Sequence, residues 1–250
     1  MTAREPRWLL CRRRRPAAAL RLYCFPHSGG SPGEYVRWAD AVPDTIEVWA
    51  VQLPGRGSRG GEQPITDLNT VVEAFVSETR LTPPYAFFGH SLGAGIAYHA
   101  ARLLRDRSLP EPTRLIASSY AAPHLHRSPI SLETANGPDL VDAVTRLFGA
   151  IPDELRHDPH ALERHLRPLR ADLTIAATHR YVEDAPLTCP VTVWSGQDDG
   201  ETEDRLAAWI DHTVAACTFR RFPGGHFYFR DRLPEFLADL GATLMRDRTG

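Results

Sequence analysis

Short apolar runs alternate with amphipathic segments along the first half of the chain. The runs have the length of strands and occupy residues 20–25, 46–52, 85–89 and 114–118. Between them, apolar side chains recur at helical spacing, as in the stretch from Leu68 to Val76 that follows Thr66, the expected N-cap. Strands that alternate with helices are typical of βαβ units, so the pattern predicts an α/β fold with a mainly parallel central sheet flanked by helices.

The second half of the chain interrupts this alternation and then resumes it. Strands are expected at residues 191–194 and 218–222, with helices around residues 206–210 and 234–245. Between residues 123 and 182, the apolar positions instead follow a helical period. They form two faces, one with Leu140, Val141, Val144, Leu147 and Phe148, the other with Leu162, Leu166, Leu169, Leu173 and Ala176.

This helical segment is too short to enclose a second core, so we interpret it as a lid that packs its apolar faces over the sheet edge. The alternative is a pair of ordinary crossover helices that happen to be long. The chain then divides into a basic N-terminal tail (1–19), the first part of the core (20–122), a helical lid insertion (123–182) and the second part of the core (183–250). The arginine run in the tail is expected to be solvated and poorly ordered, or alternatively to dock an acidic partner.

Composition narrows the choice of partners and compartment. The 31 acidic and 29 basic residues leave a formal charge of −2, so no overall field draws the chain onto nucleic acid or an anionic membrane. The 4 cysteines are scattered, form no CxxC pair and are too few for a disulfide framework. No apolar stretch approaches the roughly 18 residues of a membrane span or the core of a signal peptide. These features predict a soluble, cytoplasmic protein.

A candidate nucleophile follows the strand expected at residues 85–89. Residues 89–93 read GHSLG and match the G-x-S-x-G nucleophile elbow, with Ser91 at its centre. The motif is weak alone, but here a buried strand precedes it and a helix expected from Ala94 to Leu104 follows it. Two glycines permit the tight turn that projects the serine hydroxyl above the sheet, with the helix N-terminus aimed at developing negative charge.

A serine hydroxyl needs a base, and the base needs an acid that orients it. His226 fits as the base, because it follows a late strand in a loop that contains Gly224 and Gly225. The acid is expected at the end of the preceding strand, where Asp198 and Asp199 compete for the role. The order serine, aspartate, histidine is the one that an α/β-hydrolase sheet imposes.

Acyl transfer also needs hydrogen-bond donors for the oxyanion. One donor is the backbone N–H after the nucleophile, which here belongs to Leu92. The other is expected from the glycine-rich loop at residues 25–31 (FPHSGGS). Alone, this loop would be an ordinary turn. Together with the elbow, the aspartate pair and His226 in the correct order, it predicts a serine hydrolase that requires no metal and no redox cofactor.

These residues resemble one family, the stand-alone type II thioesterases that accompany polyketide synthases and nonribosomal peptide synthetases. The shared motifs are FPHSGGS (25–31), VQLPGR (51–56), GHSLGA (89–94), APH (122–124), LRAD (169–172), CPV (189–191) and FPGGHF (222–227). The resemblance implies Ser91 as nucleophile, His226 as base and Asp199, three residues after Gly196, as the triad acid. It also implies oxyanion donors from the backbone N–H groups of Ser28 and Leu92.

Four positions depart from the family pattern. Leu92 stands where methionine is frequent and Ser28 where alanine is common, and neither change affects a backbone donor. Gly200 replaces a frequent proline after Asp199, and residues 57–61 (GSRGG) replace the usual acidic and basic residues.

The resemblance implies an α/β-hydrolase fold and the removal of acyl groups from the phosphopantetheine thiol of an acyl or peptidyl carrier protein, by a monomer. Arg56 and Arg59 are then expected to steer an acidic carrier toward the channel mouth. One alternative is a general carboxylesterase or acyl-CoA hydrolase of the same fold. The other is a binding protein without activity, which the complete set of serine, aspartate and histidine disfavours.

Overall fold

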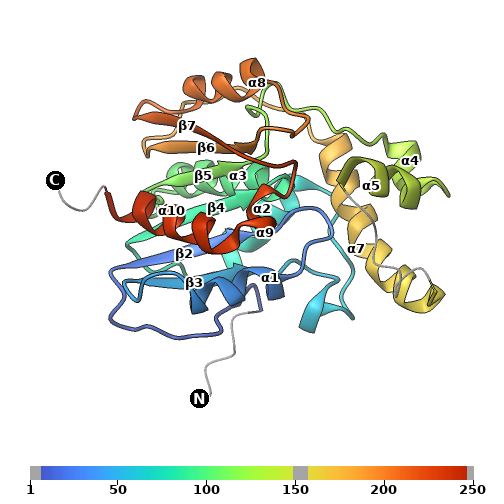
Figure 1. The fold of residues 1–250 in the computed structure, drawn as a ribbon, viewed down its shortest axis with the longest axis horizontal. Coiled ribbons are helices and arrows are strands. Elements are labelled where there is room, and N and C mark those ends of the chain that lie inside the picture. Colours follow the sequence, from blue (N-terminus) through green and yellow to red (C-terminus); the bar gives the residue numbers. More distant parts are fainter. Residues whose placement is uncertain (1–6, 149–156, 247–250) are drawn as a thin grey trace.

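A seven-stranded sheet forms the centre of the computed structural model, which describes residues 7–148 and 157–246 (Figure 1). In sheet order, the strands are β1 (Leu9–Leu10), β3 (Ile46–Val51), β2 (Leu20–Phe25), β4 (Tyr85–His90), β5 (Leu115–Ser118), β6 (Val191–Gly196) and β7 (Cys217–Phe222). Of the described strands, only β1 runs antiparallel to its neighbour. The predicted α/β fold with a mainly parallel sheet is confirmed.

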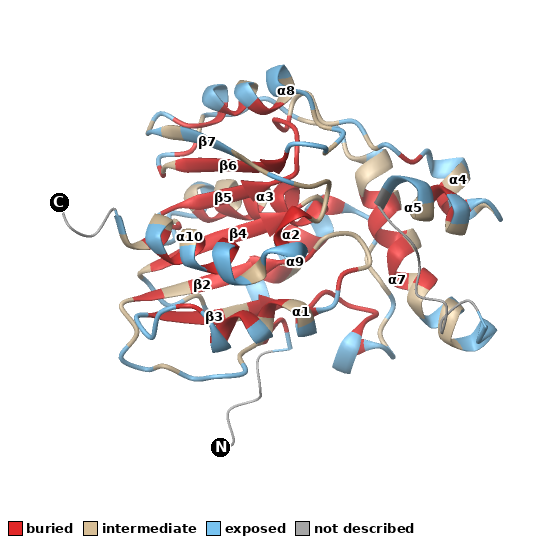
Figure 2. Cartoon of the chain, in the orientation of Figure 1, coloured by how far each residue is buried: buried red, intermediate tan, exposed pale blue. Residues whose placement is uncertain are grey.

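Helices cover both faces of this sheet. One face packs against α1 (Pro32–Val36), the 3-10 helix η1 (Arg37–Asp40), α9 (Tyr228–Asp231) and α10 (Leu233–Met245). The other packs against α2 (Leu68–Glu78), α3 (Leu92–Asp106), α8 (Glu203–Ala207) and the 3-10 helix η3 (Ala208–His212). Because side chains on both faces of the central strands are covered, these strands are apolar at consecutive positions, and Figure 2 shows them buried.

Two local predictions differ from the structure. The N-cap of α2 is Asp67, not Thr66, because the Asp67 carboxylate accepts the N–H of Thr70 at 2.8 Å, and a negative charge suits a helix N-terminus. The helix expected at residues 206–210 is divided between α8 and η3. There the indole N–H of Trp209 donates to the carbonyl of Tyr120 at 2.9 Å, a tertiary contact that a local pattern does not contain.

The arginine run near the N-terminus is ordered, not poorly ordered as expected, although Arg12, Arg13 and Arg14 remain exposed to solvent. The guanidinium of Arg15 donates to the backbone carbonyls of Ala39 and Ile46, at 2.8 and 2.7 Å. The Nε of Arg14 and the backbone N–H of Arg15 both donate to Oε1 of Glu47, whose side chain is fully buried. A buried carboxylate needs such partners, so this segment is held by groups that are distant in the sequence.

Three described helices lie between β5 and β6, beyond the end of the sheet (Figure 1). These inserted helices are α4 (Leu132–Asn136), α5 (Leu140–Phe148) and α7 (Pro159–Thr178). They bury an apolar cluster of their own, which includes Leu140, Leu166 and Leu173. The apolar faces of these helices therefore pack against one another. No helix in the described ranges is long and apolar enough to cross a membrane.

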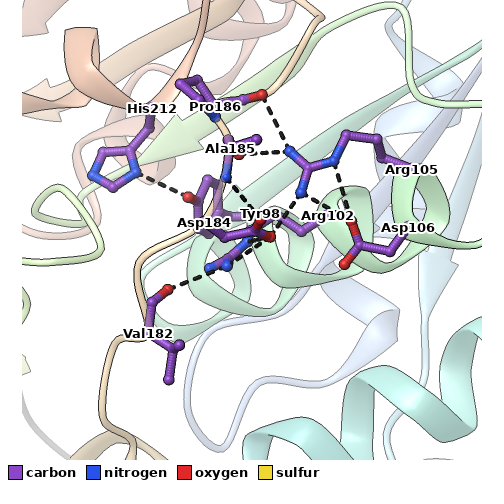
Figure 3. Close-up of polar contacts among 9 residues, drawn as sticks. All are labelled: Tyr98, Arg102, Arg105, Asp106, Val182, Asp184, Ala185, Pro186 and His212. Atoms are coloured by element: carbon purple, nitrogen blue, oxygen red, sulfur yellow. Dashed lines mark hydrogen bonds and ion pairs between the residues drawn. The ribbon is translucent and has the colours of Figure 1, made fainter.

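The segment that returns from α7 to the sheet is bound to α3 (Figure 3). Arg102 donates to the carbonyl of Val182 at 3.2 Å and to Asp184 at 3.0 Å. Arg105 donates to Asp184 at 2.7 Å and to the carbonyl of Pro186 at 3.1 Å. Because α3 begins directly after Ser91, these contacts fix one end of the insertion relative to the elbow.

Candidate active site

The junction between β4 and α3 carries Ser91. Strand β4 ends at His90 and α3 starts at Leu92, so Ser91 alone makes the turn, with φ 54° and ψ −127°. Few non-glycine residues adopt a positive φ, and a strained serine between strand and helix is typical of a nucleophile elbow. The N–H of Ser91 donates to the carbonyl of Ser118 at 2.8 Å, which joins the elbow to β5.

Two glycines let the elbow approach its neighbours closely. A Cβ at Gly89 would lie 2.3 Å from the carbonyl oxygen of Gly93, and a Cβ at Gly93 would lie 2.2 Å from that of Phe25. Side chains do not tolerate such distances, so glycine is required at both positions. The second contact sets the elbow against the end of β2, where the loop with Ser28 begins.

An imidazole and a carboxylate face each other across the loops that follow β7 and β6. Nδ1 of His226 lies 3.1 Å from Oδ1 of Asp199, and the two side chains are 14% and 5% exposed. The loops approach so closely that a Cβ at Gly196 would lie 2.2 Å from the carbonyl oxygen of Gly225. Asp198 is exposed, so the geometry favours Asp199 over Asp198 as the partner of the imidazole.

The charge state of Asp199 suits this partnership. Burial raises the pKa of its carboxyl, but His226, the Ser119 hydroxyl and the Gly200 N–H outweigh burial and lower the pKa below its usual value. The Gly200 N–H donates to Oδ1 at 2.8 Å. An ionised carboxylate accepts a hydrogen bond from the Nδ1–H of His226, which leaves Nε2 as the basic nitrogen.

Two further imidazoles lie in the site and stay neutral. The ring of His90 is 4.9 Å from that of His226, which puts His226 beside the elbow. Burial holds the pKa of His90 well below its usual value, and burial together with the Arg230 charge lowers the pKa of His27 to about 3. Neither histidine was predicted from the sequence to have a role in the site. Their positions in the sequence could have indicated such a role, because His90 directly precedes the nucleophile and His27 directly precedes the expected oxyanion donor Ser28.

The residues expected to hold an oxyanion lie at the ends of neighbouring strands. Leu92 is the first residue of α3, and the first N–H groups of a helix have no partner within it. Ser28 lies in a four-residue turn that the Gly30 N–H closes on the carbonyl of His27, at 2.8 Å. Because β2 pairs with β4, this turn and the elbow meet at one edge of the sheet.

Arg56 and Arg59 do not have the exposure that a steering role requires, so that expectation is wrong. Arg56 is 7% exposed and forms a bidentate pair with Asp172 of α7, with both N–O distances at 2.7 Å. Arg59, in the 3-10 helix η2 (Gly57–Arg59), is 6% exposed, pairs with Glu62 and covers the ring of Trp8. Both charges are compensated inside the protein and do not attract a partner from solution.

A cavity of about 570 Å³ lies where the inserted helices meet the core, a volume suited to a small ligand. Its walls include Pro123 and His124 after β5, and Ala176 at the end of α7. Arg127 and Arg180 also line it, and both are exposed. Among the described residues, these two guanidiniums bond only to backbone carbonyls.

Across residues 7–148 and 157–246, no three His, Cys, Asp or Glu side chains are grouped so as to hold a metal ion.

Comparison with known proteins identifies a matching family and similar chains. The family model for the thioesterase domain matches residues 20–244. The chain is 32% identical over 234 residues to the gramicidin S biosynthesis protein GrsT of Aneurinibacillus migulanus, covering 92% of this chain and 91% of GrsT.

Solved structures of thioesterases are also similar to this chain. The chain resembles the type II thioesterase BorB from the borrelidin biosynthetic cluster, with a TM-score of 0.84 and 31% identity, over 94% of this chain and 96% of BorB. It also resembles YbtT, a type II thioesterase from the yersiniabactin NRPS/PKS biosynthetic pathway, with a TM-score of 0.77 and 26% identity, over 91% of this chain and 93% of YbtT.

Proposed function

Because this chain belongs to the thioesterase family, we propose that it hydrolyses acyl thioesters of carrier proteins through Ser91, His226 and Asp199. The observation that carries the proposal is the contact of His226 Nδ1 with Asp199 Oδ1, at 3.1 Å, beside the strained elbow of Ser91. Family membership itself makes the chain a hydrolase that acts on thioesters.

Hydrolysis proceeds through two acyl transfers. In the first, Nε2 of His226 takes the proton of the Ser91 hydroxyl while Oγ attacks the thioester carbon, and the N–H groups of Ser28 and Leu92 stabilise the oxyanion. Collapse breaks the C–S bond, and His226 returns the proton to the sulfur, giving an acyl-serine and a carrier thiol. In the second, His226 deprotonates a water that attacks the acyl-serine, and the proton returns to Oγ as the carboxylic acid leaves.

The proposed partner is an acyl or peptidyl carrier protein with a phosphopantetheine arm. Support comes from the family resemblance and from BorB and YbtT, which are type II thioesterases of biosynthetic pathways. Residues 123–182 would then act as a lid on a core made of residues 20–122 and 183–250. The cytoplasmic location and the monomeric state stay predictions.

We expect a higher kcat/KM for an acyl group on its carrier protein than for the same group on a small thiol. The carrier would add a docking surface, and the exposed cations Arg127 and Arg180, which line the cavity, are the groups that we expect to attract an acidic carrier. Salt screens such attraction over about 10 Å at 0.1 M, so the advantage of the carrier should shrink as salt rises. Steady-state kinetics with both substrates over a salt series measures this difference.

Charge reversal tests which cations contribute. Arg127→Glu together with Arg180→Glu should reduce the carrier advantage by about tenfold and leave small-thioester hydrolysis unchanged. Arg13→Glu, at an exposed site in the N-terminal segment, is the matched control and should change neither rate. Equal kcat/KM values for both substrates at every salt concentration would contradict carrier recognition and favour the general esterase.

A larger side chain at Ala176 should shorten the acyl chains that the enzyme accepts. Ala176 lines the cavity of about 570 Å³, whereas Leu173 is 2% exposed within the cluster of the inserted helices. Ala176→Phe should therefore lower kcat/KM for long acyl chains by about tenfold and leave acetyl hydrolysis unchanged. Leu173→Phe is the control for packing alone and should lower Tm instead. A folded Ala176→Phe protein with an unchanged chain-length profile would count against a cavity that holds the acyl chain.

A further inference from the structure

Both carboxylate oxygens of Asp172 are used at the contact between α7 and the turn that carries Ser28. Oδ1 accepts from Nη2 of Arg56 at 2.7 Å. Oδ2 accepts from Nη1 of Arg56 at 2.7 Å and from the backbone N–H of Gly29 at 2.8 Å. Asp172 is 1% exposed. One buried side chain of an inserted helix thus holds both a core arginine and the backbone of the glycine-rich loop.

The Gly29 N–H decides the form of this turn. Gly30 closes the turn on His27, Gly29 has φ 71°, and Ser28 is absent from the described residues with positive φ, which together define a type II turn. In type II, the peptide between the two central residues is rotated by about 180° from its orientation in type I. Glycine adopts either form, so an acceptor fixed on one side of the Gly29 N–H selects between them. Asp172 is that acceptor.

The hydrogen bond that closes the turn sets the direction of the Ser28 N–H, and Asp172 holds the closed turn in place through Gly29. The His27 carbonyl points into the turn toward Gly30, and the Ser28 N–H belongs to the same planar peptide, so it points out of the turn. Arg56 steadies the arrangement from the other side, with Nη1 3.4 Å from the carbonyl of Gly30. Helix α7 also packs closely against the turn. A Cβ at Gly29 would lie only 3.1 Å from Cδ1 of Leu169 in α7.

We propose that Asp172 is a positioning residue for catalysis, which anchors the turn of Ser28 in the position where its N–H serves as an oxyanion donor. The inference rests on the proposed function, in which the Ser28 N–H is that donor. Asp172 itself does not touch the substrate. Its effect on the rate passes through the Gly29 N–H, and Arg56 keeps the carboxylate in the bidentate orientation that leaves Oδ2 available to Gly29.

Asp172→Asn is the direct test. An asparagine amide carries no negative charge and turns its NH2 donor toward one guanidinium nitrogen or toward the Gly29 N–H, so it cannot accept all three hydrogen bonds of the carboxylate. We expect kcat to fall by about 10- to 100-fold, less than the full loss of a donor, with KM within about twofold. A trifluoromethyl ketone analogue of the acyl chain forms a tetrahedral adduct on Ser91, and its affinity should fall by the same factor as kcat/KM.

Two further variants separate positioning from stability. Glu163→Gln removes an exposed ion pair with Arg170 from the same helix and should leave kcat and ketone affinity unchanged. Arg56→Lys keeps the charge and one hydrogen bond to Asp172, so it should lose less ketone affinity than Arg56→Ala. If Asp172→Asn fails to fold, this ranking of the two Arg56 variants still tests the proposal, and equal ketone affinities would overturn it.

Rates are expressed per site labelled to completion by a fluorophosphonate, so that unfolded protein does not count. An Asp172→Asn protein with the kcat per labelled site and the ketone affinity of the wild type would overturn this inference alone. Wild-type protein that takes no label at Ser91 and hydrolyses no thioester would overturn the proposed function and this inference with it.

Discussion

Replacing Ser91 with alanine should abolish thioester hydrolysis while the protein stays folded. The hydroxyl is the attacking group of the proposed mechanism, and the loss should be at least about 10⁴-fold in kcat. The Ser91 side chain makes no capping hydrogen bond to α3, so its removal costs the helix little. Steady-state hydrolysis of an acyl thioester gives the rate, and thermal unfolding gives Tm, which should stay close to that of the wild type.

The same loss is expected for His226→Ala, and the two losses should not add. Nucleophile and base act as one unit, so the double variant should be little slower than either single variant. Substantial turnover by purified Ser91→Ala protein would remove Ser91 from the mechanism. A double variant slowed by the product of the two single effects would mean that the two residues act independently.

Replacing Asp199 with asparagine should lower kcat by about 10³- to 10⁴-fold, because the amide favours the wrong tautomer of the imidazole. The Asp199 carboxylate accepts from Nδ1 of His226 at 3.1 Å. Its lowered pKa keeps it ionised at neutral pH, where it stabilises the imidazolium that forms during attack. An asparagine amide that donates to Nδ1 would favour the tautomer with its proton on Nε2. Nε2 is the nitrogen that must accept the serine proton, so this tautomer cannot act as the base.

Asp198→Asn is the matched control, since it makes the same change at the adjacent residue. Asp198 is exposed, so its replacement should lower kcat by less than about threefold. Measurement of kcat for both variants at one pH decides between the two carboxylates. A large loss in Asp198→Asn with a small loss in Asp199→Asn would move the acid to Asp198.

The alternation of apolar runs and helical faces was enough to predict the parallel sheet. Strands such as β4 are buried on both faces, so apolar residues mark them without any tertiary information. The elbow was predictable for a related reason. Its two glycines and the serine are adjacent in sequence, and the steric need for glycine arises within the same turn and at the neighbouring end of β2.

Partners that are distant in sequence were not predictable from the residues themselves. Arg56 and Asp172 are 116 residues apart, and neither position signals that the other lies opposite. The expected steering role required an exposed Arg56, whereas Arg56 is 7% exposed and pairs with Asp172 of α7. The order of the arginine run was not predictable for the same reason, because Glu47 becomes a buried acceptor only once the sheet has formed. Buried charges must be paired with other groups of the protein, and which charges are buried depends on the whole fold.

The central claim is that Ser91 receives the acyl group from a carrier protein, and acyl transfer can be observed directly. An acyl-phosphopantetheine carrier is mixed with the enzyme and quenched in acid within the first turnovers, and both proteins are analysed by mass spectrometry with peptide mapping. We predict that the carrier loses the acyl group while the peptide that contains Ser91 gains its mass transiently, and that Ser91→Ala protein shows neither change. Two results would contradict the account. One is an acyl group found on a residue other than Ser91, and the other is a Ser91→Ala protein that deacylates the carrier as fast as the wild type.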